Sequence, residues 1–135
     1  MDLAPGLVTL LKKPAYGQLA TVMPDGSPQV TQVWLDTDGE HILVNTGVDH
    51  QKARNVRRDP RVAVNVHDAA SSARIAAIRG RVVEVTSAGA DEHIVALSRK
   101  YLGTDRYPYG RPGEQRVILR IRPERITAYG LEGDF

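Results

Sequence analysis

Short turns between strand-like segments limit the fold of this chain more than any other feature. Alternating patterns at residues 17–23 and 29–36 flank the sequence Pro24-Asp25-Gly26-Ser27-Pro28. An Asp-Gly turn between two such runs predicts a β-hairpin. A second turn at residues 36–39 leads to a third pattern at 41–46. Parallel strands need a connection of about a dozen residues or more, so these neighbouring strands must pair antiparallel.

The same alternation continues through the rest of the chain. It predicts strands at residues 61–67, 74–86, 116–122 and 126–129. The pattern at 61–67 is the clearest, since three valines point to one side and polar residues to the other. Gly80 interrupts the longest pattern, at a position where a barrel strand bends or bulges.

Three helices are expected beside the strands. The first covers residues 3–12, with an interruption near Pro5, and the second is a short polar helix within residues 49–62. The third covers residues 88–102 and stops at Gly103. There is no repeat, low-complexity tract or linker, so we expect one domain over residues 1–135. The predicted fold is mainly β (α+β): an antiparallel barrel with peripheral helices.

Composition excludes several classes of protein. At 135 residues the chain can bury its own core, and the absence of cysteine excludes disulfides, thiolate nucleophiles and Cys-type zinc sites and fits a reducing cytoplasm. A net charge of +2 and 5% scattered aromatic residues argue against nucleic-acid binding. No stretch approaches the roughly 20 apolar residues that span a bilayer. We therefore expect a soluble cytoplasmic protein with neither a membrane nor a nucleic acid as partner.

The common catalytic motifs are absent from the sequence. It has no Gly-x-Gly-x-x-Gly, no Walker-type glycine loop and no serine in a Gly-x-Ser-x-Gly elbow. The four histidines show no metal-ligand spacing, so no metal site is expected, and no catalytic residue can be assigned. Such a chain fits a protein whose bound cofactor supplies the reactivity.

Residues 49–62 contain the best candidate for a binding site. A helix that starts after a strand presents unpaired N–H groups and a favourable dipole to an anion, so Lys52 is a candidate ligand for a phosphate. The alternative is a solvated amphipathic helix that only packs Ala53 and Val56 inward. Lys52 and Arg54 can face one ligand only if Lys52 lies in the first turn; otherwise Lys52 pairs with Asn55.

Several of these segments occur in the order found in one known family. They are Leu19-Ala20-Thr21-Val22 with the following Pro-Asp-Gly-Ser-Pro turn, Val33-Trp34, residues 51–62, Gly80, Arg116-Val117-Ile118-Leu119 and Pro123-Glu124-Arg125. In this the chain resembles the pyridoxamine-phosphate-oxidase-like split-barrel flavoproteins, and more narrowly the branch that uses the deazaflavin coenzyme F420. The resemblance extends over residues 15–130, and the Lys-x-Arg-Asn-x-x-x-Asp-Pro-Arg run is its most specific part.

The resemblance implies a homodimer of split β-barrels with two cofactor sites at the subunit interface. Lys52 would hold the cofactor phosphate, and Gln32, Val33 and Trp34 would lie along the ring system. In some relatives an arginine stands two residues before this lysine, where this chain has His50. That substitution weakens the phosphate site unless the imidazole is protonated or Arg54 compensates. The implied cofactor-binding residues are Thr31, Gln32, Val33, Trp34, Asn45, Thr46, His50, Gln51, Lys52, Arg54 and Asn55.

The function that the resemblance implies is F420-dependent reduction of an unsaturated or conjugated small molecule. The alternatives are an FMN-dependent oxidase or reductase and a flavin-binding carrier or sensor without turnover. Trp34 equally suits a half-buried aromatic in the dimer interface. Tyr101, Tyr107 and Tyr109 are candidates for the substrate mouth or for packing, and the small residues Ala76 and Ala77 for room beside a stacked ring.

Overall fold

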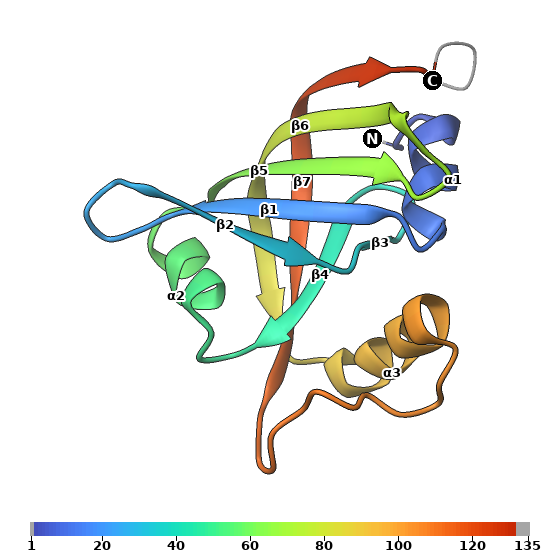
Figure 1. Ribbon diagram of the computed structural model, residues 1–135. Helices are drawn as coiled ribbons and strands as arrows, with labels where there is room; N and C mark the ends of the chain where they lie inside the picture. The colour runs from blue at the N-terminus through green and yellow to red at the C-terminus, as the bar shows by residue number, and fades with distance from the viewer. Residues whose placement is uncertain (1, 132–135) are drawn as a thin grey trace.

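The computed structural model describes residues 2–131 as one curled sheet with three helices (Figure 1). The helices are α1 (Pro5–Lys12), α2 (Gln51–Arg58) and α3 (Ala90–Leu102). The strands are β1 (Tyr16–Val22), β2 (Pro28–Val33), β3 (Asp36–Thr37), β4 (Ile42–Gly47), β5 (Arg61–Asp68), β6 (Ser71–Thr86) and β7 (Arg116–Tyr129).

All strand pairs are antiparallel, as the short turns predict, and the order across the sheet is β2-β1-β5-β6-β7-β4-β3. The two end strands, β2 and β3, do not pair with each other in this sheet. The barrel therefore stays open between them. This is the predicted split barrel.

The core lies inside this curled sheet. Val62, Val64 and Val66 of β5 point inward as their alternation predicts, at 7% exposure or less. They pack in one cluster with inward residues of the other strands and with Leu7 and Leu11 of α1. The alternation in the sequence thus identified the inner face correctly.

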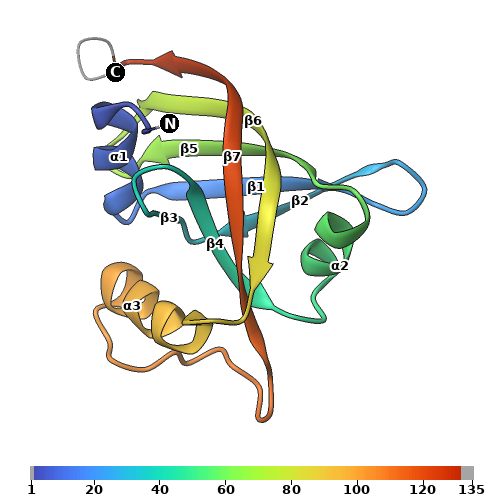
Figure 2. The same cartoon turned by 180° about the vertical axis from the view of Figure 1, so that it is seen from behind.

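The helices cover different parts of the sheet (Figures 1 and 2). α1 and α2 lie at opposite ends of β1 and β5. α3 lies outside the barrel, where Ala90 forms a small buried cluster with Leu43 and Ile118. Because of this contact, β4 and β7 bury residues on both faces, which a simple alternation does not predict.

The end of the chain differs from the prediction. We expected two strands, at residues 116–122 and 126–129, but β7 is continuous from Arg116 to Tyr129. Its pairing with β6 shifts register between Arg79 and Gly80, which confirms the irregularity expected at this glycine. A Cβ on residue 80 would lie 2.4 Å from the carbonyl oxygen of Arg122. Glycine thus allows β7 to pass close to β6 through Pro123 without a break.

Residues 34–37 also differ from the prediction. We expected β2 to reach residue 36 and a turn to follow, but β2 ends at Val33, and Asp36 and Thr37 pair with β4. The Thr37 hydroxyl donates to the carbonyl oxygen of His41 at 2.7 Å, which holds the crossing segment in place. Trp34 therefore lies on the link between the two end strands, at the opening of the barrel.

Candidate functional site

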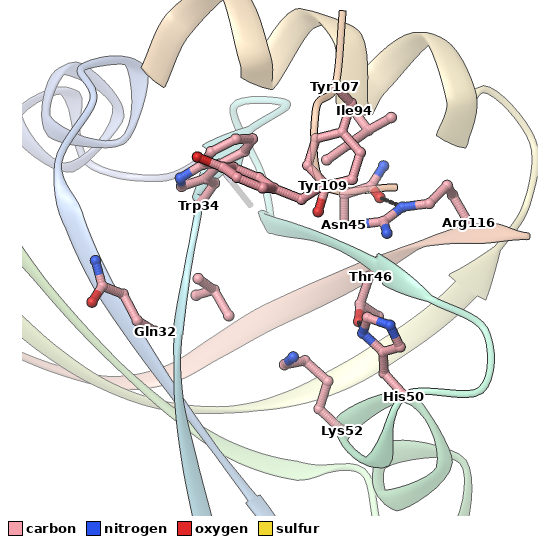
Figure 3. A pocket seen from close by; sticks show the side chains of 11 residues that line it. Gln32, Trp34, Asn45, Thr46, His50, Lys52, Ile94, Tyr107, Tyr109 and Arg116 are labelled. Atoms are coloured by element: carbon pink, nitrogen blue, oxygen red, sulfur yellow. Dashed lines mark hydrogen bonds between the residues drawn. The ribbon is translucent and has the colours of Figure 1, made fainter. Parts of the chain in front are cut away.

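A cavity of about 310 Å³ lies at this opening, between β2 and β4 (Figure 3). α2 closes it on one side, and the loop after α3 lies on the other. Its lining residues are Gln32, Val33, Trp34, Asn45, Thr46, His50, Lys52, Ile94, Tyr107, Tyr109 and Arg116. Seven of these belong to the eleven predicted cofactor-binding residues.

The split explains why a cavity forms here. Within the described sheet, β2 pairs only with β1, and β3 is so short that it pairs with β4 only at Ile42 and Leu43. The edge of β2 and the later part of β4 therefore face each other without a ladder between them. Unpaired strand edges present backbone donors and acceptors to a ligand.

Lys52 provides a cation without a partner at this opening. It lies in the first turn of α2, and its side chain points into the cavity (Figure 3). Among residues 2–131 its ammonium has no hydrogen bond and no ion pair, and the alternative pairing with Asn55 is wrong. Burial, and then the nearby charge of Arg116, lower the pKa of Lys52. An anion bound beside this ammonium would stabilise its positive charge.

His50 lies beside Lys52 in the expected position, at the N-cap of α2. Its Nδ1 is 3.1 Å from Thr46 Oγ1, and its Nε2 is 3.5 Å from Glu114 Oε2. A Cβ on residue 47 would lie 2.8 Å from the imidazole ring, so Gly47 makes room for it. These contacts with Thr46 and Glu114 hold the imidazole in the cavity lining, and its role in place of the missing arginine stays a prediction.

The other arginines of α2 do not line the cavity. Arg54 is exposed and donates to the Gln51 side chain at 2.6 Å. Arg57 donates to the carbonyl oxygen of Val48. Arg58 donates to the carbonyl oxygen of Val22.

Four predicted cofactor-binding residues lie outside the cavity lining: Thr31, Gln51, Arg54 and Asn55. Asn55 is fully buried, and its Nδ2 donates to Thr21 Oγ1 at 3.0 Å, while its Oδ1 accepts from Gln51. The bond to Thr21 attaches α2 to β1. The cofactor contacts of these four residues stay predictions.

Aromatic side chains form the other end of the cavity. The Trp34 and Tyr101 rings are stacked, with 5.2 Å between centroids and 7° between planes. Tyr107 meets Trp34 edge-on at 5.9 Å, and Tyr109 lies tilted at 6.3 Å from it. Tyr101 itself packs behind Trp34, with its hydroxyl donating to the carbonyl oxygen of Ala15. The loop tyrosines thus line the cavity, and Tyr101 supports Trp34.

Two expectations about the cavity are wrong. Ala76 is buried in the core and Ala77 lines a hollow elsewhere on the sheet, so neither makes room at the opening. The residues that the sequence did not reveal are Ile94 and Arg116. Arg116 is half of the long-range pair with Asn45, 71 residues away, and no local spacing signals such a pair.

The residues that the structure describes contain no group of three or more His, Asp or Glu side chains that could hold a metal ion. None of their helices is long and apolar enough to cross a membrane.

Comparison with known proteins places the chain in a family. The family model described as pyridoxamine 5'-phosphate oxidase matches residues 3–130. The chain belongs to the pyridoxamine 5'-phosphate oxidase family. The predicted split barrel and the predicted family are both confirmed.

Two curated family members show the range of relatives. The chain is 34% identical to 5a,11a-dehydrotetracycline/5a,11a-dehydrooxytetracycline reductase of Streptomyces rimosus over 131 residues, 94% of this chain and 82% of that protein. It is 30% identical to the pyridoxine/pyridoxamine 5'-phosphate oxidase of Rhodopseudomonas palustris over 128 residues, 92% of this chain and 59% of that oxidase.

Solved structures superpose on this chain over most of its length. A structure named F420 reductase superposes with a TM-score of 0.76 at 34% identity, covering 88% of this chain and 94% of that one. A conserved hypothetical protein from Mycobacterium tuberculosis superposes with a TM-score of 0.70 at 27% identity, covering 93% of this chain and 83% of that one.

Proposed function

We propose that this protein is an oxidoreductase that uses the reduced deazaflavin coenzyme F420 to reduce a small conjugated organic molecule. The observation that carries the proposal is the ammonium of Lys52 at the split, which has no partner within residues 2–131 and lies opposite a wall of aromatic side chains. A coenzyme that carries a phosphate and a flat ring system would place the phosphate at Lys52 and the rings toward the aromatic side chains. The names of the F420 reductase and the dehydrotetracycline reductase support the same choice.

The residues of the cavity fit such a coenzyme. Burial lowers the pKa of Lys52, because its charge is poorly solvated there, and a phosphate beside it would stabilise that charge. Gln32 and Val33 lie on the open edge of β2, where backbone groups can meet the edge of a ring. When bound, the reduced coenzyme supplies a hydride. The protein orients the two rings and excludes water from them.

We also propose that the protein acts as a homodimer with cofactor sites shared between subunits. An apolar hollow of about 370 Å³ on the outer sheet face supports this, because it is floored by small residues such as Ala20, Ala63 and Ala77. Beside it Val30, on the edge strand β2, is 63% exposed. A second copy would remove this surface from water. A cytoplasmic location remains an expectation.

An FMN-dependent oxidase or reductase is the second candidate, since the family includes pyridoxine/pyridoxamine 5'-phosphate oxidases. The cations near α2 favour F420, which carries an acidic oligoglutamate tail. Among residues 2–131, Arg54, Arg57 and Arg58 donate to neutral groups and form no ion pair, although the charge of Arg58 acts on Asp59; Arg61 pairs with Asp59 at 2.7 Å.

The test is a titration of the purified protein with F420 and with FMN at low and high salt. Tighter binding of F420 that weakens as salt is added is the expected result, because exposed charges are screened over a Debye length of about 8 Å at physiological salt. Preference for FMN would replace the proposal with the FMN-dependent alternative. Binding of F420 without turnover of any conjugated acceptor would favour a carrier or sensor.

A further inference from the structure

The guanidinium of Arg116 is held on three sides where it meets the aromatic end of the cavity (Figure 3). Its Nε donates to Asn45 Oδ1 at 2.9 Å, its Nη1 donates to Glu114, and the Tyr107 ring centroid lies 4.9 Å from its Cζ. The side chain is only 8% exposed. Within residues 2–131, Nη2 makes no hydrogen bond, so this part of a cavity-lining residue is available to a ligand.

A chain of hydrogen bonds behind Arg116 has only one consistent orientation. A guanidinium can only donate, so the atom of Asn45 that faces Arg116 must be the amide oxygen. The amide nitrogen then donates to the carbonyl oxygen of Ala90 at 2.8 Å and to His93 Nδ1 at 3.2 Å. His93 Nδ1 must therefore carry a lone pair. The proton of the neutral imidazole is on Nε2, which lies 3.1 Å from Asp36 Oδ2.

The charge of Asp36 fits this orientation. Burial raises the pKa of Asp36, but the hydrogen bond from His93, the Thr37 backbone and Lys12 outweigh it and bring the pKa to about 2. The carboxylate is therefore ionised at neutral pH and needs a donor, which His93 Nε2 provides. Asp36, His93 and Asn45 thus form a fixed support that extends from the first residue of β3 to Arg116.

The two cations of the cavity differ in how they are compensated. Lys52 has no carboxylate beside it in the described chain, whereas Arg116 is paired with Glu114. A permanent anion such as a phosphate is stabilised more by the uncompensated ammonium of Lys52 than by the paired guanidinium of Arg116. A paired, rigid guanidinium suits an oxygen that is neutral in the substrate and becomes charged during the reaction, because such a contact strengthens only in the transition state.

We propose that Arg116 binds the carbonyl oxygen of an α,β-unsaturated carbonyl substrate and that His93 is a positioning residue that holds Arg116 through Asn45. The proposal rests on the proposed function and names its substrate class. Hydride addition to the β-carbon forms one C–H bond and moves the π electrons onto the carbonyl oxygen. The resulting enolate takes a proton from water at the α-carbon. Trp34 and Tyr107 provide flat walls for such a conjugated molecule.

The first experiment measures the binding of an enolate mimic, so it does not depend on turnover. 4-Nitrophenolate carries its charge on an oxygen conjugated to a flat ring, and 4-nitroanisole is the neutral match. With oxidised F420 bound, the protein should bind the phenolate about tenfold to a hundredfold more tightly than the anisole, as one charge-assisted hydrogen bond allows. Arg116→Gln should lose this preference.

Arg120→Gln is the matched control. Arg120 lies on the same strand and is also paired with a carboxylate, Glu84, but it does not line the cavity. This variant should keep the preference for the phenolate. An Arg116→Gln variant that also keeps it overturns the proposal.

A separate F420 titration of each variant separates this proposal from the proposed function. Arg116→Gln should bind F420 within about twofold of the parent. If it weakens F420 binding as much as Lys52→Ala does, Arg116 belongs to the phosphate site and the proposal is overturned. If the parent binds no F420, the proposed function fails. The phenolate titration is then made with coenzyme-free Lys52→Ala, with and without Arg116→Gln, so that the ammonium does not compete and the role of Arg116 is still decided.

His93 is tested by a spectroscopic signature and by rescue. Nitrogen-15 NMR of histidine-labelled protein should show His93 as the Nε2–H tautomer, and an Nδ1–H signal would contradict the positioning role. His93→Gln retains one acceptor for Asn45 and one donor for Asp36, so it should keep the phenolate preference. His93→Leu should lose the preference while binding F420 normally. A leucine variant that keeps the preference would remove His93 from the proposal.

Discussion

Replacement of Lys52 by alanine tests the binding site most directly. Its ammonium points into the cavity and has no partner in the described chain, so the substitution removes no contact on which the fold depends. The substitution removes only what a ligand would use. We therefore expect weaker coenzyme binding without weaker folding, a combination that few cavity substitutions give.

The structure sets the size of both effects. A charge-assisted hydrogen bond to a phosphate contributes roughly 1.5–3 kcal/mol, so the dissociation constant for F420 should rise about 10- to 150-fold. Burial lowers the pKa of Lys52, which means that its charge is less well solvated in the folded state. Removing that charge should leave the thermal midpoint unchanged or slightly raise it.

The assay is a fluorescence or calorimetric titration with F420, beside thermal melts of the same samples. Lys52→Arg keeps the charge and should retain most of the affinity. Lys13→Ala removes a lysine outside the cavity lining, one that pairs with Asp68, and is the control; it should bind as the parent does. Equal affinity of Lys52→Ala and the parent would refute the phosphate site, as would an equal loss in both alanine variants.

Three further predictions concern the fold. Burial lowers the pKa of Lys100 to about 8, below its unfolded value, so the unfolded state binds more protons between pH 8 and 10. Urea melts should therefore show the free energy of unfolding rising with pH over that window. The Lys100→Met variant should show no such rise. Asn55→Ala should cost about 1–3 kcal/mol in urea melts, because Thr21 and Gln51 lose their buried partner, and a loss below that range would contradict it. Sedimentation should give twice 14.8 kDa for the parent and a monomer for Val30→Asp; a monomeric parent that binds F420 tightly would refute the shared site.

The sequence was sufficient for the strands because their inner faces repeat every two residues. Val62, Val64 and Val66 illustrate this, and the Asp-Gly turn before β2 fixed the antiparallel pairing. The continuous β7 was not predicted because Pro123 normally interrupts a strand. Here it pairs opposite Gly80, where the missing side chain allows the backbones to approach.

The site was only partly predictable for a related reason. Lys52 and His50 are visible as a local strand-to-helix junction, and the structure places both at one cavity. Arg116 joins that cavity through Asn45, which lies on the neighbouring strand but 71 residues away in sequence. Pairings between distant strands are set by the whole sheet, and a single sequence without aligned relatives does not show them.

The split of the barrel connects these observations. Because β3 ends after two residues, β4 extends beyond it. Its Asn45 and Thr46 pair with β7 but have no strand on the side where β3 has ended, and both line the cavity. The same extension brings Asn45 between His93 of α3 and Arg116 of β7. Two cations thus reach one cavity from different elements, Lys52 uncompensated and Arg116 paired. A fixed anion and a transient oxyanion are different electrostatic tasks, and this arrangement provides a separate group for each.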